Sequence, residues 1–568
     1  MTSRSRHASA ACFMIACSHP LAGPRATPPT HTTADSAQLP VEIRVDAASA
    51  LGPLSRPWRY FGADEPNYAT TASGEQLLAA MGALAPGEVY FRAHNLLTSG
   101  DGLPALKWGS TNAYTEPDGV PRFDFTLVDA ILEAGLRHGV RPLVEIGFMP
   151  EALSRSPAPY RHDWPRSLFT GWTQPPTDYA KWEELVYRWA RHSVDKYGAE
   201  EVSRWWWETW NEPNIGYWSG TPEEFFRLND HALAAVRRAL PAARVGGPHT
   251  AGDGGEFMER FLEHALRGTN YATGERGTPL DYLAFHAKGG VEWVDGHVRM
   301  DMGTQLRTIE TAFARFSRYP ELAGKPVIIG ESDPESCAAC TDKQYEYRNG
   351  PAYASYTAAV FPRKLELAER HGIQLEGAVT WAFTFDGQPP FAGFRQVASN
   401  GVPMAVFNAF RMFAKLGPER VVAQSSAQLP LAELLAHGAR ERADVGVLAS
   451  RGPAGVSILI WHHHDEVTAG PPAHVRLTVS GLPRELATVS SAQYRIDEDH
   501  SNAHAAWRHL GSPPRPTAAE QAQLQRASEL QLLEARTLPV QAGEAELELT
   551  LPRHGVSLVL LEAQVGGA

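Results

Sequence analysis

The sequence is poor in cysteine, in positive charge and in long apolar runs, and each shortage excludes a class of protein. Two of its four cysteines, Cys12 and Cys17, lie near the start. The other two, Cys337 and Cys340, have no second pair for a structural zinc site, so a tight disulfide or two idle thiols remain the alternatives. The net charge of −12 makes nucleic acid and anionic membrane poor partners. Beyond the N-terminal segment, no run approaches the roughly 18 apolar residues of a membrane span.

What the sequence does contain is the composition of a globular protein. It is 43% hydrophobic and 20% charged, and 568 residues exceed one ordinary core, which indicates a large domain with a smaller one. The 15 tryptophans are the unusual feature. Sugar-binding clefts use the flat indole face, although most tryptophans in any protein belong to the core.

Residues 1–38 have the pattern of an export segment and linker. Arg4 and Arg6 give a positive start, a short apolar run follows to Cys17, and a Pro/Thr/His-rich stretch comes next. Met14–Cys17 resembles a bacterial lipoprotein cleavage box, which would place a lipid on Cys17 as the only membrane attachment. We therefore expect an exported, periplasmic or envelope-attached protein, and a cytoplasmic one if this segment is not a signal.

Eight short apolar runs alternate with amphipathic helical stretches between residues 55 and 418. The runs read as nearly continuous apolar, as parallel strands buried on both faces do. They are Trp58–Ala63, Val89–Ala93, Arg141–Gly147, Arg204–Thr209, Arg244–Pro248, Asp281–Ala287, Pro326–Glu331 and Glu376–Trp381. The helices include Trp182–Tyr197, Pro222–Leu240, Gly255–Arg267, Met302–Phe316 and Ala354–His371. This α/β pattern predicts a (β/α)8 TIM barrel; a doubly wound sheet is the alternative, but no G-x-G-x-x-G follows any strand.

The pattern changes at about Gly417, and residues 419–568 predict an accessory β-sandwich. Its strands have a period near two and are separated by Gly/Pro turns. They are Val445–Ser450, Gly455–Trp461, His474–Ser480, Thr488–Ile496, Glu544–Leu551 and Val556–Leu561. A polar, helix-prone insertion covers Pro513–Ala535. The isolated strand Val41–Ala47, within residues 39–54, is expected to join this sandwich.

Polar residues at the carboxyl ends of barrel strands are the candidates for catalysis. The fourth strand runs into Trp210-Asn211-Glu212-Pro213, which places a carboxylic acid beside a side-chain amide. Breaking a glycosidic bond needs an acid for the leaving oxygen, and an amide can hydrogen-bond the sugar 2-hydroxyl. An N-cap or turn is the alternative for Asn-x-Pro. Glu331 ends the seventh strand and is the expected second carboxylate; Asp333 and Glu335 compete with it but lie beyond the strand.

Several motifs, in order along the chain from about residue 55, resemble glycoside hydrolase family 39, the β-xylosidase and α-L-iduronidase family. They are W-E-T-W-N-E-P-N (207–214), R-A-H-N-L-L (92–97), L-D-Y-L-A-F-H-A-K-G (280–289), I-G-E-S-D-P (329–334), R-G-T-N-Y-A-T-G (267–274) and Y-R-I-D-E-D-H-S-N-A (494–503). The resemblance implies a retaining glycosidase with Glu212 as acid/base and Glu331 as nucleophile. It also implies that Asn211, His94 and His286 contact sugar hydroxyls. Without the resemblance, His286 would more often be a core histidine.

The remaining candidates concern the substrate. Trp381 ends the eighth strand and Asp386 lies beyond it, and both are expected to contact sugar. Lys288 matches a lysine that iduronidases direct at the substrate carboxylate, and Arg395 lies near their arginine. Instead of binding substrate, Lys288 could form an ion pair with an acid at the rim of the barrel, such as Asp333. No metal or cofactor is expected.

We predict an exo-acting β-D-xylosidase (a xylan 1,4-β-xylosidase type of enzyme) with α-L-arabinosidase side activity, acting on an oligosaccharide or glycoside. An α-L-iduronidase-like or other uronic-acid glycosidase is the alternative among enzymes. A catalytically inactive carbohydrate-binding protein is the alternative outside them, but such a protein would be expected to lose one of the two glutamates, and both are present.

Overall fold

The computed structural model of the protein describes residues 38–107, 109–161 and 169–563. The expected export segment, including the candidate lipid site at Cys17, lies outside the described residues apart from Gln38. In the described part of the chain, no helix combines the length and the apolar character needed to cross a membrane.

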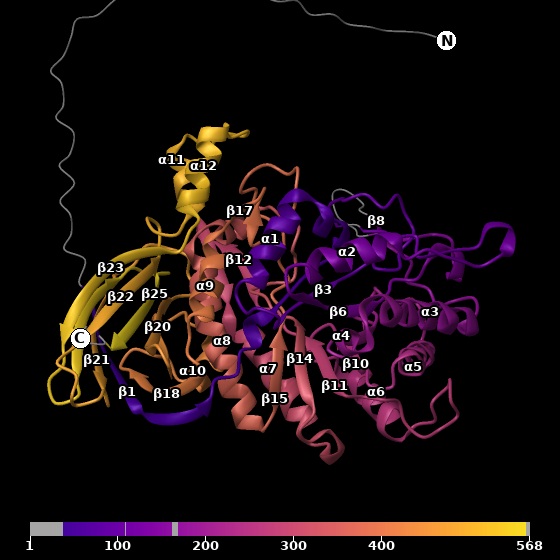
Figure 1. Cartoon of the computed structure of the whole chain (residues 1–568), viewed down its shortest axis with the longest axis horizontal. Helices are drawn as coiled ribbons and strands as arrows, with labels where there is room; N and C mark the ends of the chain where they lie inside the picture. The colour runs from indigo at the N-terminus through magenta and orange to yellow at the C-terminus, as the bar shows by residue number, and fades with distance from the viewer. Residues whose placement is uncertain (1–37, 108, 162–168, 564–568) are drawn as a thin grey trace, which may run out of the picture. The chain divides into compact units, whose positions relative to one another are not determined.

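Eight parallel strands form one sheet that closes on itself as a barrel (Figure 1). In spatial order they are β15 (Gln374–Ala378), β14 (Pro326–Glu331), β11 (Tyr282–His286), β10 (Arg244–Thr250), β9 (Trp206–Thr209), β6 (Val140–Ile146), β3 (Val89–Ala93) and β2 (Tyr60–Ala63). The first and last strands meet just beyond β15, where Thr380 N donates to Tyr60 O (2.9 Å) and Gly62 N donates to Thr380 O (3.1 Å). The prediction of a TIM barrel is confirmed.

The barrel strands are apolar because both of their faces are buried. All five residues of β11 are buried, and the same holds for all four of β9. Tyr60, Tyr90, Trp206 and Tyr282 belong to a single cluster of side chains from these strands, with Tyr60 stacked on Tyr90 at 4.8 Å. Because this cluster fills the barrel interior, polar side chains gather where the strands end.

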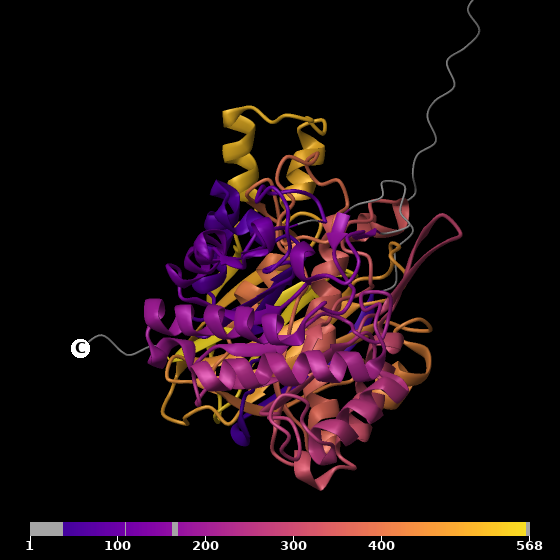
Figure 2. The same cartoon turned by 90° about the vertical axis from the view of Figure 1, so that its right-hand side faces the viewer.

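Long helices cover the outside of the barrel: α3 (Tyr179–Tyr197), α5 (Pro222–Ala239), α6 (Gly255–Arg267), α7 (Met302–Phe316) and α8 (Pro351–His371). The side chain of Asp178 accepts from Ala180 N (2.8 Å) and so starts α3 three residues before the predicted Trp182. Thr221 and Glu224 form a capping box at α5. Figure 2 shows α3 and α5, in purple and magenta, running side by side.

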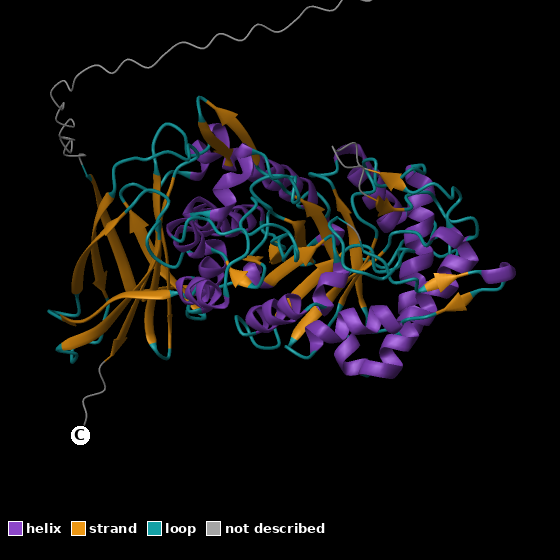
Figure 3. Ribbon diagram, turned by 90° about the horizontal axis from the view of Figure 1, so that it is seen from above, coloured by secondary structure: helices purple, strands orange, loops and turns teal. Residues whose placement is uncertain are grey.

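The second sheet has nine strands, and Figure 3 shows them as a group apart from the barrel strands. Their order is β23 (Gln531–Pro539), β22 (Thr488–Ile496), β25 (Val556–Ala563), β20 (Gly455–His463), β19 (Asp444–Gly452), β18 (Glu419–Ser425), β1 (Leu39–Pro53), β21 (Ala473–Ser480) and β24 (Ala545–Leu551). The two edge strands touch, since Arg536 Nη2 donates to Glu548 O (3.2 Å). The sheet therefore curves over a shared core, as the predicted sandwich requires.

The N-terminal strand β1 joins this sheet, as predicted, and is longer than expected. Val41 lies opposite Val475 of β21 in parallel register, and Val45 lies opposite Ala423 of β18 in antiparallel register. Two strands of this nine-stranded sheet were not predicted, β18 and β23. Most residues of β23 are exposed at the sheet edge, and the strand has no alternating apolar pattern. The predicted insertion over 513–535 therefore extended too far, and its helical part is α12 (Ala518–Ala527).

Helix α8 connects the barrel to the sandwich through buried polar contacts. Ser355 Oγ lies 3.1 Å from His463 Nδ1, and Arg363 Nη2 donates to Asp444 Oδ1 (3.3 Å). Trp461 Nε1 donates to the other carboxylate oxygen of Asp444 (2.8 Å). These contacts lie where the sandwich faces the barrel. A separate set of apolar residues forms the core of the sandwich itself.

The core of the sandwich should depend on β1. Ile43 is fully buried there, so Ile43→Ala should lower the free energy of unfolding by about 2–5 kcal/mol, the range for a buried isoleucine. Arg44 points to solvent on the same strand, and Arg44→Ala is the matched control, with a change within about 0.5 kcal/mol. Urea unfolding measures both. Equal effects of the two substitutions would contradict this placement of β1.

Candidate active site

The two glutamates predicted to be catalytic lie at the same end of the barrel. Glu331 is the last residue of β14, and Glu212 follows β9 by three residues. The turn after β9 has left-handed backbone at Trp210 (φ 73°) and Glu212 (φ 45°). Hydrogen bonds from Trp210 N to Ile146 O (3.1 Å) and from Glu212 N to His249 O (3.0 Å) hold this conformation. Such backbone is costly for non-glycine residues and is typical of functional sites.

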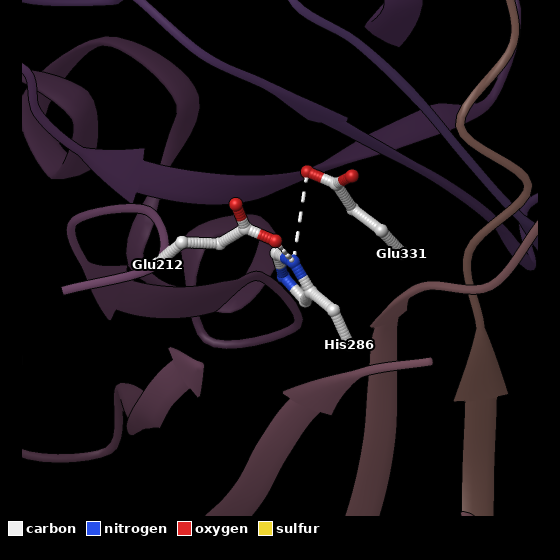
Figure 4. Close-up of side chains that lie close together, drawn as sticks. All are labelled: Glu212, His286 and Glu331. Carbon is white, nitrogen blue, oxygen red and sulfur yellow. Dashed lines mark hydrogen bonds and ion pairs between the residues drawn. The ribbon is translucent and has the colours of Figure 1, made fainter. Parts of the chain in front are cut away.

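His286, at the end of β11, lies between the two carboxylates (Figure 4). Its Nδ1 is 2.9 Å from Glu212 Oε1 and 3.7 Å from Glu331 Oε1. One oxygen of each carboxylate and one nitrogen of His286 all lie within 4.8 Å of one another. Retaining glycosidases space their carboxyl groups about 5–5.5 Å apart and inverting ones about 6.5–9.5 Å, so the spacing fits retention.

Positive groups surround Glu331. Lys288 Nζ lies 2.8 Å from Oε2, and Arg92 Nη1 and His94 Nε2 lie 3.3 and 3.4 Å from Oε1. Burial alone would raise the pKa of Glu331, but Lys288 and the neighbouring histidines outweigh it and hold this pKa well below its usual value. Glu331 is therefore an ionised carboxylate over the whole neutral range, as a nucleophile must be.

Beneath the pair lies Arg92 of β3, which is entirely buried. Its Nε lies 2.5 Å from Glu208 Oε1 and its Nη2 lies 2.9 Å from Glu145 Oε2. Nη2 also donates to Asn211 Oδ1 (3.2 Å). Because the amide oxygen of Asn211 is engaged by Arg92, its NH2 group is the part that can reach a ligand.

The two predicted histidines have different surroundings. His94 Nδ1 lies 2.5 Å from Glu145 Oε2, and its Nε2 lies 3.3 Å from Asp64 Oδ1. Burial opposes a charged ring, but Glu145 raises the pKa of His94. For His286, burial prevails over the nearby carboxylates and lowers the pKa. One ring thus favours the charged form and the other the neutral form.

Trp381 follows β15 and completes the wall beside His94, with ring centroids 4.3 Å apart. Its Nε1 donates to Asp64 Oδ1 (3.2 Å), and its backbone N donates to Asp333 Oδ1 (2.9 Å). Arg395 Nε donates to Trp381 O (3.0 Å). Eight of the nine predicted site residues are thereby linked in one connected group: Glu212, Glu331, Asn211, His94, His286, Lys288, Trp381 and Arg395.

The structure places Asp386 outside this group. Asp386 accepts hydrogen bonds from the hydroxyls of Thr71 (2.6 Å), Thr384 (3.0 Å) and Ser73, which tie the loop after β15 to the start of α1 (Ala72–Gly82). Arg395 is buried behind the site.

Asp333 lies between the guanidinium of Arg395 and the ammonium of Lys288. Arg395 Nη2 lies 3.5 Å from Asp333 Oδ2, and Lys288 Nζ lies 2.5 Å from the same oxygen. The ion pair between Lys288 and Asp333 is therefore present, together with the contact between Lys288 and Glu331.

Arg92, Glu208, His249 and Lys107 also belong to the site and were missing from the prediction. Arg92 and Glu208 could have been found, since each is a charge within an apolar strand, and Arg92 shares the face of His94 two residues on. His249, at the end of β10, pairs with Glu208, and burial lowers its pKa well below the usual value. Lys107 comes from a long loop and pairs with Asp64; burial lowers its pKa to about 8. No pattern in the sequence marks Lys107.

Glu212, His286 and Glu331 also have the spacing of a metal-ligand group. However, Lys288 and Arg92 already neutralise Glu331 at 2.8 and 3.3 Å. A divalent cation at this point would face two fixed positive charges. The group is better suited to proton transfer and nucleophilic attack than to holding a metal.

Comparison with known proteins assigns this chain to a family. Residues 41–544 match the model of glycosyl hydrolases family 39. The β-xylosidase of Geobacillus stearothermophilus is 26% identical over 495 residues, covering 83% of this chain and 86% of that protein. The α-L-iduronidase of Mus musculus is 28% identical over 573 residues, covering 92% and 81%.

A solved structure of a bacterial orthologue of human α-L-iduronidase has the same fold. It superposes with a TM-score of 0.74 at 22% identity and covers 94% of this chain and 85% of that one. The family match spans both the barrel and most of the sandwich. The chain belongs to glycosyl hydrolase family 39 and is a glycosidase that hydrolyses O-glycosyl bonds of a carbohydrate substrate.

Proposed function

We propose that the chain is a retaining, exo-acting β-D-xylosidase with Glu331 as nucleophile and Glu212 as acid/base. The observation that carries these roles is the contrast between the two carboxylates, which lie within 4.8 Å of each other. Glu331 faces Lys288 and Arg92, which favour an ionised attacking group. The nearest partner of Glu212 is His286, whose neutral form burial favours.

Hydrolysis then proceeds by double displacement. A carboxylate oxygen of Glu331 attacks the anomeric carbon and forms a glycosyl ester, while the bond to the leaving oxygen breaks and Glu212 gives that oxygen its proton. In the second step Glu212 takes a proton from water, the water oxygen attacks the anomeric carbon, and the ester bond breaks. The product keeps the configuration of the substrate, and both glutamates return to their starting states.

The neighbouring residues have roles in binding. The amide NH2 of Asn211 is available to the sugar 2-hydroxyl, a hydrogen bond that strengthens in the transition state. His94 and Trp381 form an adjoining wall, with the indole plane beside the imidazole. We assign them to the subsite of the sugar that is cleaved off.

Two observations support the preference for xylose. Some of the relatives are β-xylosidases, and both Lys288 and Arg395 already have carboxylate partners within the protein. Two curated β-xylosidases, 26% and 25% identical, match over 83% and 79% of this chain. Lys288 is already paired with Glu331 and Asp333, and Arg395 with Asp333 and Glu335. Side activity on α-L-arabinopyranosides follows from the similar ring. The second candidate is an iduronidase-like uronic-acid glycosidase, which the presence of Lys288 in the site favours.

The two catalytic roles predict opposite outcomes with azide. Glu331→Gly should abolish turnover of an activated aryl glycoside, and azide should restore it with an inverted glycosyl azide. Glu212→Ala should lose about 10²–10⁴-fold, most for poor leaving groups, and give a retained azide. NMR of the products identifies the anomers. Glu200→Ala, at an 87% exposed side chain, is the control. The same anomer from both variants would refute the assignment.

The substrate can be identified by kcat/KM on aryl xyloside, arabinopyranoside, arabinofuranoside, glucoside and iduronide. We expect the wild-type protein to prefer the xyloside. Lys288→Met should then damage all substrates alike, because Lys288 acts on Glu331. If Lys288 instead bound a substrate carboxylate, the uronide alone would lose an additional 10–150-fold, about 1.5–3 kcal/mol for one charge-assisted hydrogen bond. A preference for the iduronide would overturn the xylosidase assignment.

We also propose export, with a lipid on Cys17. The composition of the N-terminal segment supports export, and so does the disulfide between Cys337 and Cys340, since disulfides persist in oxidising compartments. In a Gram-negative host, the protein should fractionate with the envelope and incorporate labelled palmitate, and Cys17→Ser should release it to the periplasm. Recovery of full-length protein from the cytoplasm would refute export.

A further inference from the structure

The loop over residues 332–341 leaves β14 directly after Glu331 and is closed by the Cys337–Cys340 disulfide. It carries two buried acids, Asp333 and Glu335. The mechanism above uses neither the disulfide nor Glu335. A series of buried contacts nevertheless connects this loop to Glu331.

Arg348 binds the disulfide end of the loop. It lies in a short helical turn, η6 (Lys343–Asn349), and is fully buried. Its Nη2 donates to Cys337 O (2.5 Å), and its Nη1 donates to Cys340 O (2.8 Å) and to Gly393 O (2.8 Å). One guanidinium thus holds the backbone of both cysteines. The disulfide keeps these two carbonyls at the spacing that a single arginine can bridge.

Glu335 joins Arg348 to Arg395. Arg348 Nη2 lies 2.8 Å from Glu335 Oε1, and Arg395 Nη1 lies 3.1 Å from Glu335 Oε2. Burial of Glu335 is outweighed by the two arginines, which lower its pKa to about 2. Arg395 also donates its backbone N–H to Ala338 O (2.8 Å), inside the disulfide turn. The turn and both arginines therefore form one buried ionic unit.

Asp333 and Lys288 connect this ionic unit to Glu331. Arg395 Nη2 lies 3.5 Å from Asp333 Oδ2, and Lys288 Nζ lies 2.5 Å from the same oxygen. Lys288 Nζ is in turn 2.8 Å from Glu331 Oε2. Asp333 Oδ1 is held separately by Trp381 N (2.9 Å), so losing the unit would remove the contact of Arg395 with Oδ2 alone. Because Lys288 binds this same oxygen, a shift of Oδ2 would change the position of the ammonium between Asp333 and Glu331.

We propose that Arg348 is a positioning residue of the hydrolytic reaction and that the Cys337–Cys340 disulfide, by holding Arg348, keeps Lys288 directed at Glu331. Reduction of the disulfide would then weaken the nucleophile. The proposal rests on the role of Glu331 proposed above. Arg348 acts through Glu335, Arg395, Asp333 and Lys288 in sequence.

Other charged groups face Glu331 and limit the size of the effect. They are Arg92 and His94 from β3, Lys107 from the loop after it, Glu212 after β9, His249 of β10 and His286 of β11. These groups lie on other elements and remain when the disulfide opens. Only the contribution of Lys288 should fall, so the pKa of Glu331 should rise in part rather than return fully to its usual value.

The test is the pH dependence of kcat/KM on the aryl glycoside that the wild-type protein hydrolyses best. Ionised Glu331 is required, so a higher pKa moves the acid limb to higher pH. We expect a shift of about 1 pH unit, or roughly tenfold lower kcat/KM on that limb, in Arg348→Met and in Cys337→Ser/Cys340→Ser. Arg370→Met, at an exposed pair with Glu310, is the matched control and should keep the wild-type profile.

A thiol reductant gives a second measurement that needs no substitution. It should shift the acid limb of the wild-type protein and leave the double serine variant unchanged. If the loop is merely structural, the variants will lose activity equally at every pH, and the proposal fails. If azide rescue of Glu331→Gly succeeds but the acid limb does not move, only this inference is overturned. Failure of azide rescue would overturn the proposed function itself.

Discussion

A single buried guanidinium organises the site, because a charge removed from water must be paired completely or the fold becomes unstable. Arg92 has no exposed surface and faces Glu145, Glu208 and Glu331. The same group fixes the amide of Asn211. Arg92 lies on β3, and its carboxylate partners lie on β6, β9 and β14, so the pairing also fixes the relative positions of four barrel strands. Stability and catalytic geometry therefore depend on the same contacts.

The packing of the barrel explains why this charge lies where it does. Aromatic side chains of several strands, with Tyr60 stacked on Tyr90, fill the interior. Arg92 lies 5.0 Å from the centroid of the Trp381 ring, where this apolar cluster meets the polar strand ends. Most of the tryptophans that suggested sugar binding serve this and the outer core instead; Trp182, Trp189, Trp205, Trp207 and Trp210 are fully buried.

The two carboxylates proposed to be catalytic differ because their neighbours come from different directions. Glu331 ends a strand and meets cations of β3 and β11, whose own positions are fixed by further buried acids. Glu212 follows a left-handed turn and is the more exposed of the two, with a 15% exposed side chain against 9%. Two chemically identical side chains can thus take opposite roles in one reaction.

The sequence by itself determined the eight barrel strands, β1 and both glutamates. Nearly continuous apolar runs are typical of strands buried on both faces, and Trp210-Asn211-Glu212-Pro213 places an acid at a strand end. The tertiary structure decided what depends on partners distant in the chain. Arg395 lies behind Asp333, Asp386 binds hydroxyls near α1, and Lys107 reaches the site from a loop. The edge strand β23 was also not predicted. An exposed strand needs no apolar pattern, and the pairing of β23 is set by β22, which lies elsewhere in the sequence.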